Sequence, residues 1–184
     1  MTTEQAEREI TTQLESGERL VWSGMPPQGL LLRGSDVFLI PFSLLWCGFA
    51  IVWETGVLMS KAPLFFALWG VPFVLIGVYF VAGRFVVDAR QRSRTAYGVT
   101  DRRVIITSGL LSRNVKSLML KTLTDVTLSE RTDGTGTITF GPTHPMARWY
   151  GGAAWAGSGM YMSTSFESIP HARDVYAKLR GLPG

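Results

Sequence analysis

The 184-residue chain contains a single cysteine, Cys47, and two histidines, His144 and His171. One cysteine excludes an internal disulfide framework and a multi-cysteine metal site, and two histidines leave little material for a histidine-rich metal centre. Charged residues make up only 17% of the chain against 46% hydrophobic residues, which excludes a disordered tail protein. The composition therefore predicts a folded protein that holds no metal or other cofactor.

The net charge of +4 is concentrated in one short window of the chain. Between residues 84 and 103 the basic residues outnumber the acidic ones by four; they are Arg84, Arg90, Arg92, Arg94, Arg102 and Arg103, against Asp88 and Asp101. A nucleic-acid binder carries a broad basic face instead. No nucleic-acid partner is expected.

Two long stretches without charge, residues 37–53 and 62–83, precede this window. A helix rises about 1.5 Å per residue and the hydrocarbon core is about 30 Å thick, so about 20 residues are needed to cross it. The second stretch is long enough, and the first is if it continues past Glu54. Buried helices of a soluble protein are the alternative, but neither stretch has a polar face. The sequence therefore predicts a transmembrane hairpin over residues 36–84, with helices at about 37–57 and 63–83.

Basic residues next to the two helices predict the orientation of the hairpin, because they favour the cytoplasmic side. Both termini are expected in the cytoplasm, with a short loop outside. Arg84, Arg90, Arg92 and Arg94 either only set this topology or also contact anionic lipid headgroups. Glu54, near a helix end, is expected to reach water.

Residues 1–35 form a cytoplasmic arm before the hairpin. Thr2 and Gln5 have the spacing of a capping box, and Ala6, Ile10 and Leu14 fall on one helical face. We expect a short amphipathic helix ending near Gly17, followed by a strand-like segment at 19–23. The helix either packs on the protein or orders only against a partner.

From about residue 95 the pattern changes to short β-rich runs separated by turn residues. The expected strands are 96–99, 103–107, 115–120, 125–131, 135–140 and 160–166. Asp133-Gly134 is a strong hairpin signal. Ser168 is a plausible N-cap for a closing helix in which Pro170 occupies the first turn and which ends at Gly181. Residues 85–184 therefore predict a small antiparallel barrel or bent sheet capped by a C-terminal helix.

One long connection, residues 141–159, is rich in glycine and aromatic residues. Arg148, Trp149, Tyr150 and Trp155 are candidates for contact with the membrane interface or with a partner protein. The alternative is a loop that folds its own aromatic side chains onto the barrel.

The run YGVTDRRVIITSGLLSR, residues 97–113, resembles the opening of bacterial pleckstrin-homology-like (PH-like) domains, with the pattern Tyr-x-apolar-Thr-x-x-Arg. The likeness continues through 118–126, the 134–138 hairpin and the closing 166–176 segment. The upstream GERLVWSGMP resembles the membrane-anchored members of that family. The resemblance implies a partly open barrel of about seven strands, the seventh being residues 19–23, and a generally non-enzymatic protein.

No catalytic motif accompanies these features: the sequence has no Gly-x-Ser-x-Gly, no Walker loop and no dinucleotide-binding glycine pattern before a helix. The expected function is that of a non-catalytic integral protein of the bacterial inner membrane, an accessory subunit or assembly scaffold of a membrane protein complex. The alternative is a self-assembling module that responds to anionic lipid. Its expected partners are membrane lipids and another membrane complex or further copies of itself.

Overall fold

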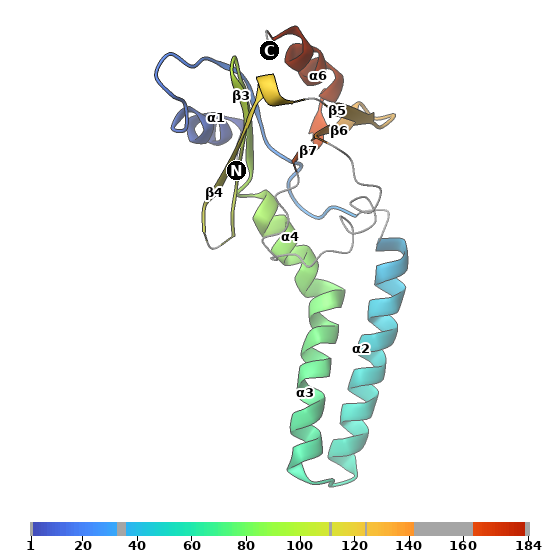
Figure 1. Ribbon diagram of the computed structural model, residues 1–184. Coiled ribbons are helices and arrows are strands. Elements are labelled where there is room, and N and C mark those ends of the chain that lie inside the picture. The colour runs from blue at the N-terminus through green and yellow to red at the C-terminus, as the bar shows by residue number, and fades with distance from the viewer. Residues whose placement is uncertain (1, 33–35, 111, 124, 142–163, 183–184) are drawn as a thin grey trace. The chain divides into compact units, whose positions relative to one another are not determined.

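The computed structural model describes residues 2–32, 36–110, 112–123, 125–141 and 164–182. The chain divides into two compact units. The β unit comprises residues 1–31 and 88–184, and the hairpin unit comprises residues 32–87 (Figure 1).

One antiparallel sheet of the β unit has the strand order β1-β2-β3-β4. Its strands are β1 (Leu20–Gly24), β2 (Ala96–Thr100), β3 (Arg103–Ser108) and β4 (Asn114–Met119), and the short 3₁₀ helix η2 (Leu120–Thr122) follows β4. The strand predicted before the hairpin is confirmed as β1, which pairs with β2 across 71 intervening residues, so that Gly24 lies opposite Tyr97. The whole hairpin unit is therefore inserted between two neighbouring strands of one sheet.

A second antiparallel sheet contains three strands in the order β5-β6-β7. These are β5 (Val126–Glu130), β6 (Thr135–Phe140) and β7 (Ser165–Pro170), and the helix α6 (Ala172–Gly181) follows. The predicted hairpin at Asp133-Gly134 is confirmed: Gly134 adopts a φ of 78°, and the Asp133 carboxylate accepts a hydrogen bond from the Thr135 amide. A hydrogen bond from the Thr135 hydroxyl, together with the one from the amide, lowers the pKa of Asp133.

The end of the β unit differs from the expectation for residues 160–170. Residues 160–163 lie outside the described part of the chain, and β7 runs on to Pro170. Ser168 is not an N-cap, because Phe166 and Ile169 are both fully buried and hold the chain in the sheet. The N-cap of α6 is His171, with a left-handed φ of 51°.

The two sheets and α6 share one hydrophobic core. Phe166 lies at its centre, with ring centroids 4.7 Å from Tyr97, 4.9 Å from Phe140 and 5.4 Å from Trp22. Sheet β1–β4 contributes Val99 to this core, and α6 contributes residues on one face, Ala172, Val175 and Leu179. The protein is thus an α+β protein with two antiparallel sheets.

The N-terminal helix α1 (Thr3–Thr11) covers the opposite face of β2 and β3. Its predicted capping box is present, but the helix ends six residues before Gly17. Successive strand residues point to opposite faces, so Ile105 packs under α1 while its neighbours enter the main core. Ile10 is fully buried there. The arm therefore packs on the β unit.

The hairpin unit consists of α2 (Asp36–Met59), α3 (Leu64–Val78) and the π-helical turn η1 (Tyr79–Gly83), after which the helix continues as α4 (Arg84–Arg92) into the β unit. The two apolar helices predicted from the sequence are confirmed. Both helices continue through an internal proline, Pro41 in α2 and Pro72 in α3.

Candidate functional site

Small residues form the contact between α2 and α3. The buried positions of α2 repeat at spacings of seven, four and three residues: Asp36, Ser43, Cys47 and Ala50. This is the pattern of a helix seam that faces one partner. On α3, Gly77 lies so close to Cys47 that a Cβ atom would come within 3.0 Å of the Cys47 Cα. Close approach of backbones at small residues is how membrane helices associate.

The rest of the hairpin surface is apolar and exposed. Phe38 and Met59 are each 80% exposed, and Leu45 is 74% exposed. In the most apolar part of the helical segment 36–59 only 22% is buried, and in that of the segment 64–92 only 11% is buried. By length and composition both helices can cross a membrane.

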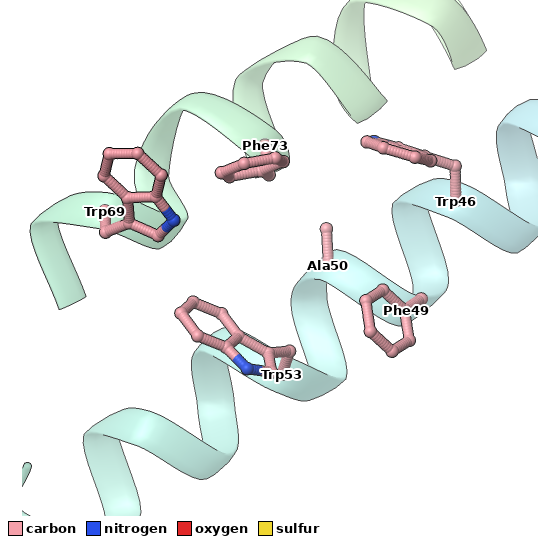
Figure 2. Close-up of a pocket in the computed structure, with 6 residues that line it drawn as sticks. All are labelled: Trp46, Phe49, Ala50, Trp53, Trp69 and Phe73. Atoms are coloured by element: carbon pink, nitrogen blue, oxygen red, sulfur yellow. The ribbon is translucent and has the colours of Figure 1, made fainter. Parts of the chain in front are cut away.

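An aromatic groove lies between the two helices (Figure 2). Its volume is about 180 Å³, and it is lined by Trp46, Phe49, Ala50 and Trp53 of α2 and by Trp69 and Phe73 of α3. Figure 2 shows Ala50 pointing toward α3 between the rings of Trp46 and Trp53. The groove can accept an apolar group, but no charged side chain lines it.

Two acidic residues of α2 lie against α3 and its continuation; Asp36 is buried, and Glu54 is partly buried. Asp36 binds Arg84 with a 2.8 Å ion pair, although the Nε and Nη2 atoms of Arg84 are buried without a hydrogen-bond partner among the described residues. The Arg84 guanidinium also lies 4.4 Å from the centre of the Phe85 ring. Glu54 was expected to reach water, but its Oε2 atom is buried near Gly70 and has no hydrogen-bond partner in the described chain.

The other arginines proposed for lipid contact lie in the β unit and differ in their surroundings. Arg92 is 5% exposed and donates to the carbonyl oxygens of Pro27 at 2.5 Å and Gly29 at 2.7 Å. Its Nη2 also lies 2.8 Å from Asp88. Arg90 and Arg94 are exposed. Arg92 therefore ties the segment that precedes the hairpin to the helix that follows it, while lipid contact by these arginines stays a prediction.

A buried ion pair joins the N-terminal arm to the turn between β2 and β3. Arg103 binds the Glu18 carboxylate with Nε at 2.8 Å and Nη2 at 2.9 Å, and the Thr100 hydroxyl donates to the same carboxylate at 2.7 Å. The bonds from Arg103 lower the pKa of Glu18 from 4.5 to about 2 despite its burial. This network explains the Thr-x-x-Arg pattern in physical terms.

Both halves of this network lie in segments that were recognised from the sequence, Glu18 in GERLVWSGMP and Thr100-x-x-Arg103 in the first β-rich run. Their contact was not predicted. They lie more than 80 residues apart, and no local spacing connects them. The pairing of Asp36 with Arg84 was missed in the same way, although both residues flank the predicted helices.

The aromatic connection, with Arg148, Trp149, Tyr150 and Trp155, lies outside the described residues. In the part of the chain that is described, no group of three or more His, Cys, Asp or Glu side chains gathers to hold a metal ion. Cys47 is a free, buried thiol in the seam of the hairpin.

A comparison with protein families supports the resemblance seen in the sequence. A family model described as "Bacterial PH domain" matches residues 38–182, which includes the hairpin as well as the strands β2–β7 and the helix α6. No curated protein and no solved structure gives a significant match. The matched region is most of the chain and contains the Thr-x-x-Arg pattern, and on this ground the chain belongs to the bacterial PH domain family.

Proposed function

We propose that this protein is a non-catalytic integral membrane protein in which α2 and α3 cross the bilayer and anchor the PH domain at its cytoplasmic surface. The observation that carries this proposal is the exposed apolar surface of both helices. A core helix of a soluble protein would be mostly buried. The arginines at and after residue 84 favour the cytoplasmic side of a bacterial inner membrane.

The pairing of β1 with β2 supports a hairpin with both ends on one side of the membrane. The two strands exchange hydrogen bonds directly, and the chain between them contains the two long apolar helices. Strands that pair must lie in the same compartment, so the intervening segment has to cross the membrane an even number of times. Two crossings satisfy this condition independently of charge.

We further propose that the two sheets close into a partly open barrel with α6 at one end. The shared core supports this arrangement, as do two hydrogen bonds: the Glu167 amide donates to the Tyr97 hydroxyl at 3.3 Å, and Lys116 of β4 donates to Thr164, just before β7, at 2.9 Å. Such a barrel presents surfaces for binding.

The PH domain acts in this proposal by binding protein, as an accessory subunit or assembly scaffold of a membrane complex. The strongly shifted ionisable pair, Glu18 and Arg103, is occupied in holding the arm to the sheet, which supports a structural role for it. The outward-facing aromatic side chains of the hairpin offer a surface to other membrane helices.

Membrane topology is tested by single-cysteine labelling in a Cys47→Ala background. A membrane-impermeant thiol reagent applied to intact spheroplasts should label Ser60→Cys in the loop between the helices. It should label Ser93→Cys, after α4, only once the membrane is opened. Labelling of both sites from outside, or release of the protein by alkaline carbonate, would show that the hairpin does not span the membrane.

The scaffold role is tested by extraction in a mild detergent followed by sizing and identification of co-purifying proteins. We expect a stoichiometric membrane complex, and we expect deletion of residues 141–159 to weaken it while membrane insertion persists. A particle containing this chain alone would instead favour self-assembly or the lipid-responsive alternative, which the exposed Arg90 and Arg94 support.

A further inference from the structure

We propose that a second site, a cleft in the β unit, binds a phosphate group. The cleft has a volume of about 330 Å³ and lies where α1, the residues after α4 and the β3–β4 turn meet. Five of its seven lining residues have charged or hydroxyl side chains, and the lining comprises Glu9, Arg94, Ser108, Gly109, Leu110, Ser112 and Arg113. The inference goes beyond the scaffold role and does not depend on it.

Arg94 is held in place at one side of the cleft. Its Nη1 atom donates to the Leu110 carbonyl oxygen at 2.5 Å. The rest of the guanidinium has no hydrogen-bond partner among the described residues, and the residue is exposed. A guanidinium fixed at one nitrogen offers its other N–H groups in a preset direction, which suits the oxygens of a phosphate.

Arg113 faces the same cleft and has only a weak internal partner. Its Nη2 atom lies 3.2 Å from the Glu9 carboxylate, and its side chain is 51% exposed. Ion pairs of this kind contribute little because water solvates both charges. A doubly charged phosphate, bound between Arg94 and Arg113, can compete with Glu9 for Arg113.

Gly109, which follows β3, lines the cleft at a position that requires glycine. A Cβ atom on Gly109 would lie 1.8 Å from the Ser112 carbonyl oxygen, so a larger residue would displace the turn. Ser108 and Ser112 line the cleft on either side of Gly109 and Leu110. Hydroxyl and guanidinium donors together match a ligand whose oxygens only accept hydrogen bonds.

Strand register shows that the cleft lies at the end of the sheet where the chain passes to and from the hairpin. Ser108 pairs with Asn114, the adjacent Thr107 pairs with Ala96 at the start of β2, and Gly24 at the end of β1 pairs with Tyr97. A phosphate could therefore come from a lipid headgroup or from a soluble phosphate compound. In both cases the ligand is a terminal phosphate that carries up to two negative charges, so the lipid would be one with a phosphate-monoester headgroup.

Binding is tested with the purified full-length protein in a neutral detergent at low salt, by calorimetric titration with inorganic phosphate and pyrophosphate. We expect saturable binding that Arg94→Gln and Arg113→Gln each weaken about tenfold or more, the loss of one charge-assisted contact. Glu9→Gln removes the competing carboxylate and should tighten binding about threefold. Arg131→Gln, which removes an exposed arginine from the β5–β6 turn, is the matched control and should bind as the unaltered protein does.

The source of the phosphate is separated in lipid nanodiscs. In a Cys47→Ala protein that carries Ser112→Cys, a neutral thiol reagent reports whether the cleft is occupied. Slower labelling in discs that contain phosphatidic acid, whose headgroup is a phosphate monoester, than in pure phosphatidylcholine discs indicates a lipid headgroup, and slower labelling on adding pyrophosphate to phosphatidylcholine discs indicates a soluble ligand. Unchanged labelling in both arms, or equal weakening by Arg131→Gln in the titration, overturns the proposal. Melting temperatures of all variants establish that they are folded.

Discussion

The carboxylate of Glu18 is the most strongly perturbed acid outside the hairpin for which a value is defined. Two nitrogens of Arg103 and the Thr100 hydroxyl bind it in a buried position, so the ionised form is favoured in the folded protein. Its pKa falls to about 2, whereas the ordinary value is 4.5. Folding and ionisation of this group are therefore linked.

The link predicts a loss of stability in acid. The contribution of Glu18 is fully present above pH 4.5 and disappears as the pH falls through about 2, a loss on the order of 3 kcal/mol. Unfolding of the protein in detergent should be followed by near-ultraviolet circular dichroism between about pH 6 and about pH 2. In Glu18→Gln the steepest part of this dependence should vanish; an identical pH profile in both proteins would contradict the assignment.

Arg92 is a structural residue although it belongs to the basic window. Replacing it with alanine leaves the carbonyl oxygens of Pro27 and Gly29 and the Asp88 carboxylate without its donors. We expect Arg92→Ala to lower the free energy of unfolding by about 3 kcal/mol, because the two backbone carbonyl oxygens lose their charge-assisted hydrogen bonds. Arg90→Ala, on the exposed face of the same helix, should change it by less than about 0.5 kcal/mol. Chemical denaturation of both variants measures the difference.

Among the elements, α1 depends on one glycine of β2. A Cβ atom on Gly98 would lie 2.4 Å from the Ile10 side chain. Gly98→Ala should therefore push α1 away and destabilise the β unit by about 1–3 kcal/mol. Combining it with Ile10→Ala should cost less than the sum of the two single changes, because the smaller side chain relieves the clash. Strict additivity in this double-mutant cycle would show that α1 does not pack as described.

The hairpin offers a similar test with an internal control. Gly77→Leu should separate α2 from α3, since even a Cβ atom would crowd Cys47. Gly48→Leu adds the same side chain to α2 at a position with open space around it and should leave the packing intact. Fluorescence energy transfer between labels at the two helix ends reports the separation. Equal effects from both variants would contradict the seam.

The elements themselves could largely be predicted from the sequence, because their signals are local. The long apolar runs gave the helices of the hairpin, and Asp133-Gly134 gave the β5–β6 turn. The end of β7 was placed wrongly because Ser168 and Pro170 imitate a helix start, while burial of Phe166 and Ile169 keeps them in the sheet. Tertiary packing here overrides a local capping pattern.

The candidate sites were less accessible to sequence reasoning. Six clustered arginines look alike in a sequence, whereas the structure buries Arg92, pairs Arg84 with Asp36 and leaves Arg94 beside a polar cleft. The partner of each arginine is set by residues far away in the chain. The clustered charges predict a basic region of the chain. The fold shows that the individual arginines of this region have different partners.

For the molecule as a whole, β1 and β2 need a hairpin that returns to its starting side. Deleting residues 64–83 removes one apolar helix and, in the proposed topology, puts the two strands on opposite sides of the membrane. We expect the protease-resistant β unit to be lost. Replacing residues 32–87 by a short glycine–serine linker should preserve it, since Gly29 and Arg92 are in contact. A resistant β unit after the single-helix deletion would contradict the topology.

Insertion of the hairpin between paired strands also imposes an order in time. Residue 24 leaves the ribosome 73 residues before its partner, residue 97. At ordinary rates of synthesis β1 waits roughly 4 to 15 seconds for β2. During that interval α1 has no completed sheet to cover, and Ile10 has no surface on which to be buried. The PH domain can therefore be finished only after the whole hairpin has been made, and until then its unpaired strands are accessible to proteases and chaperones.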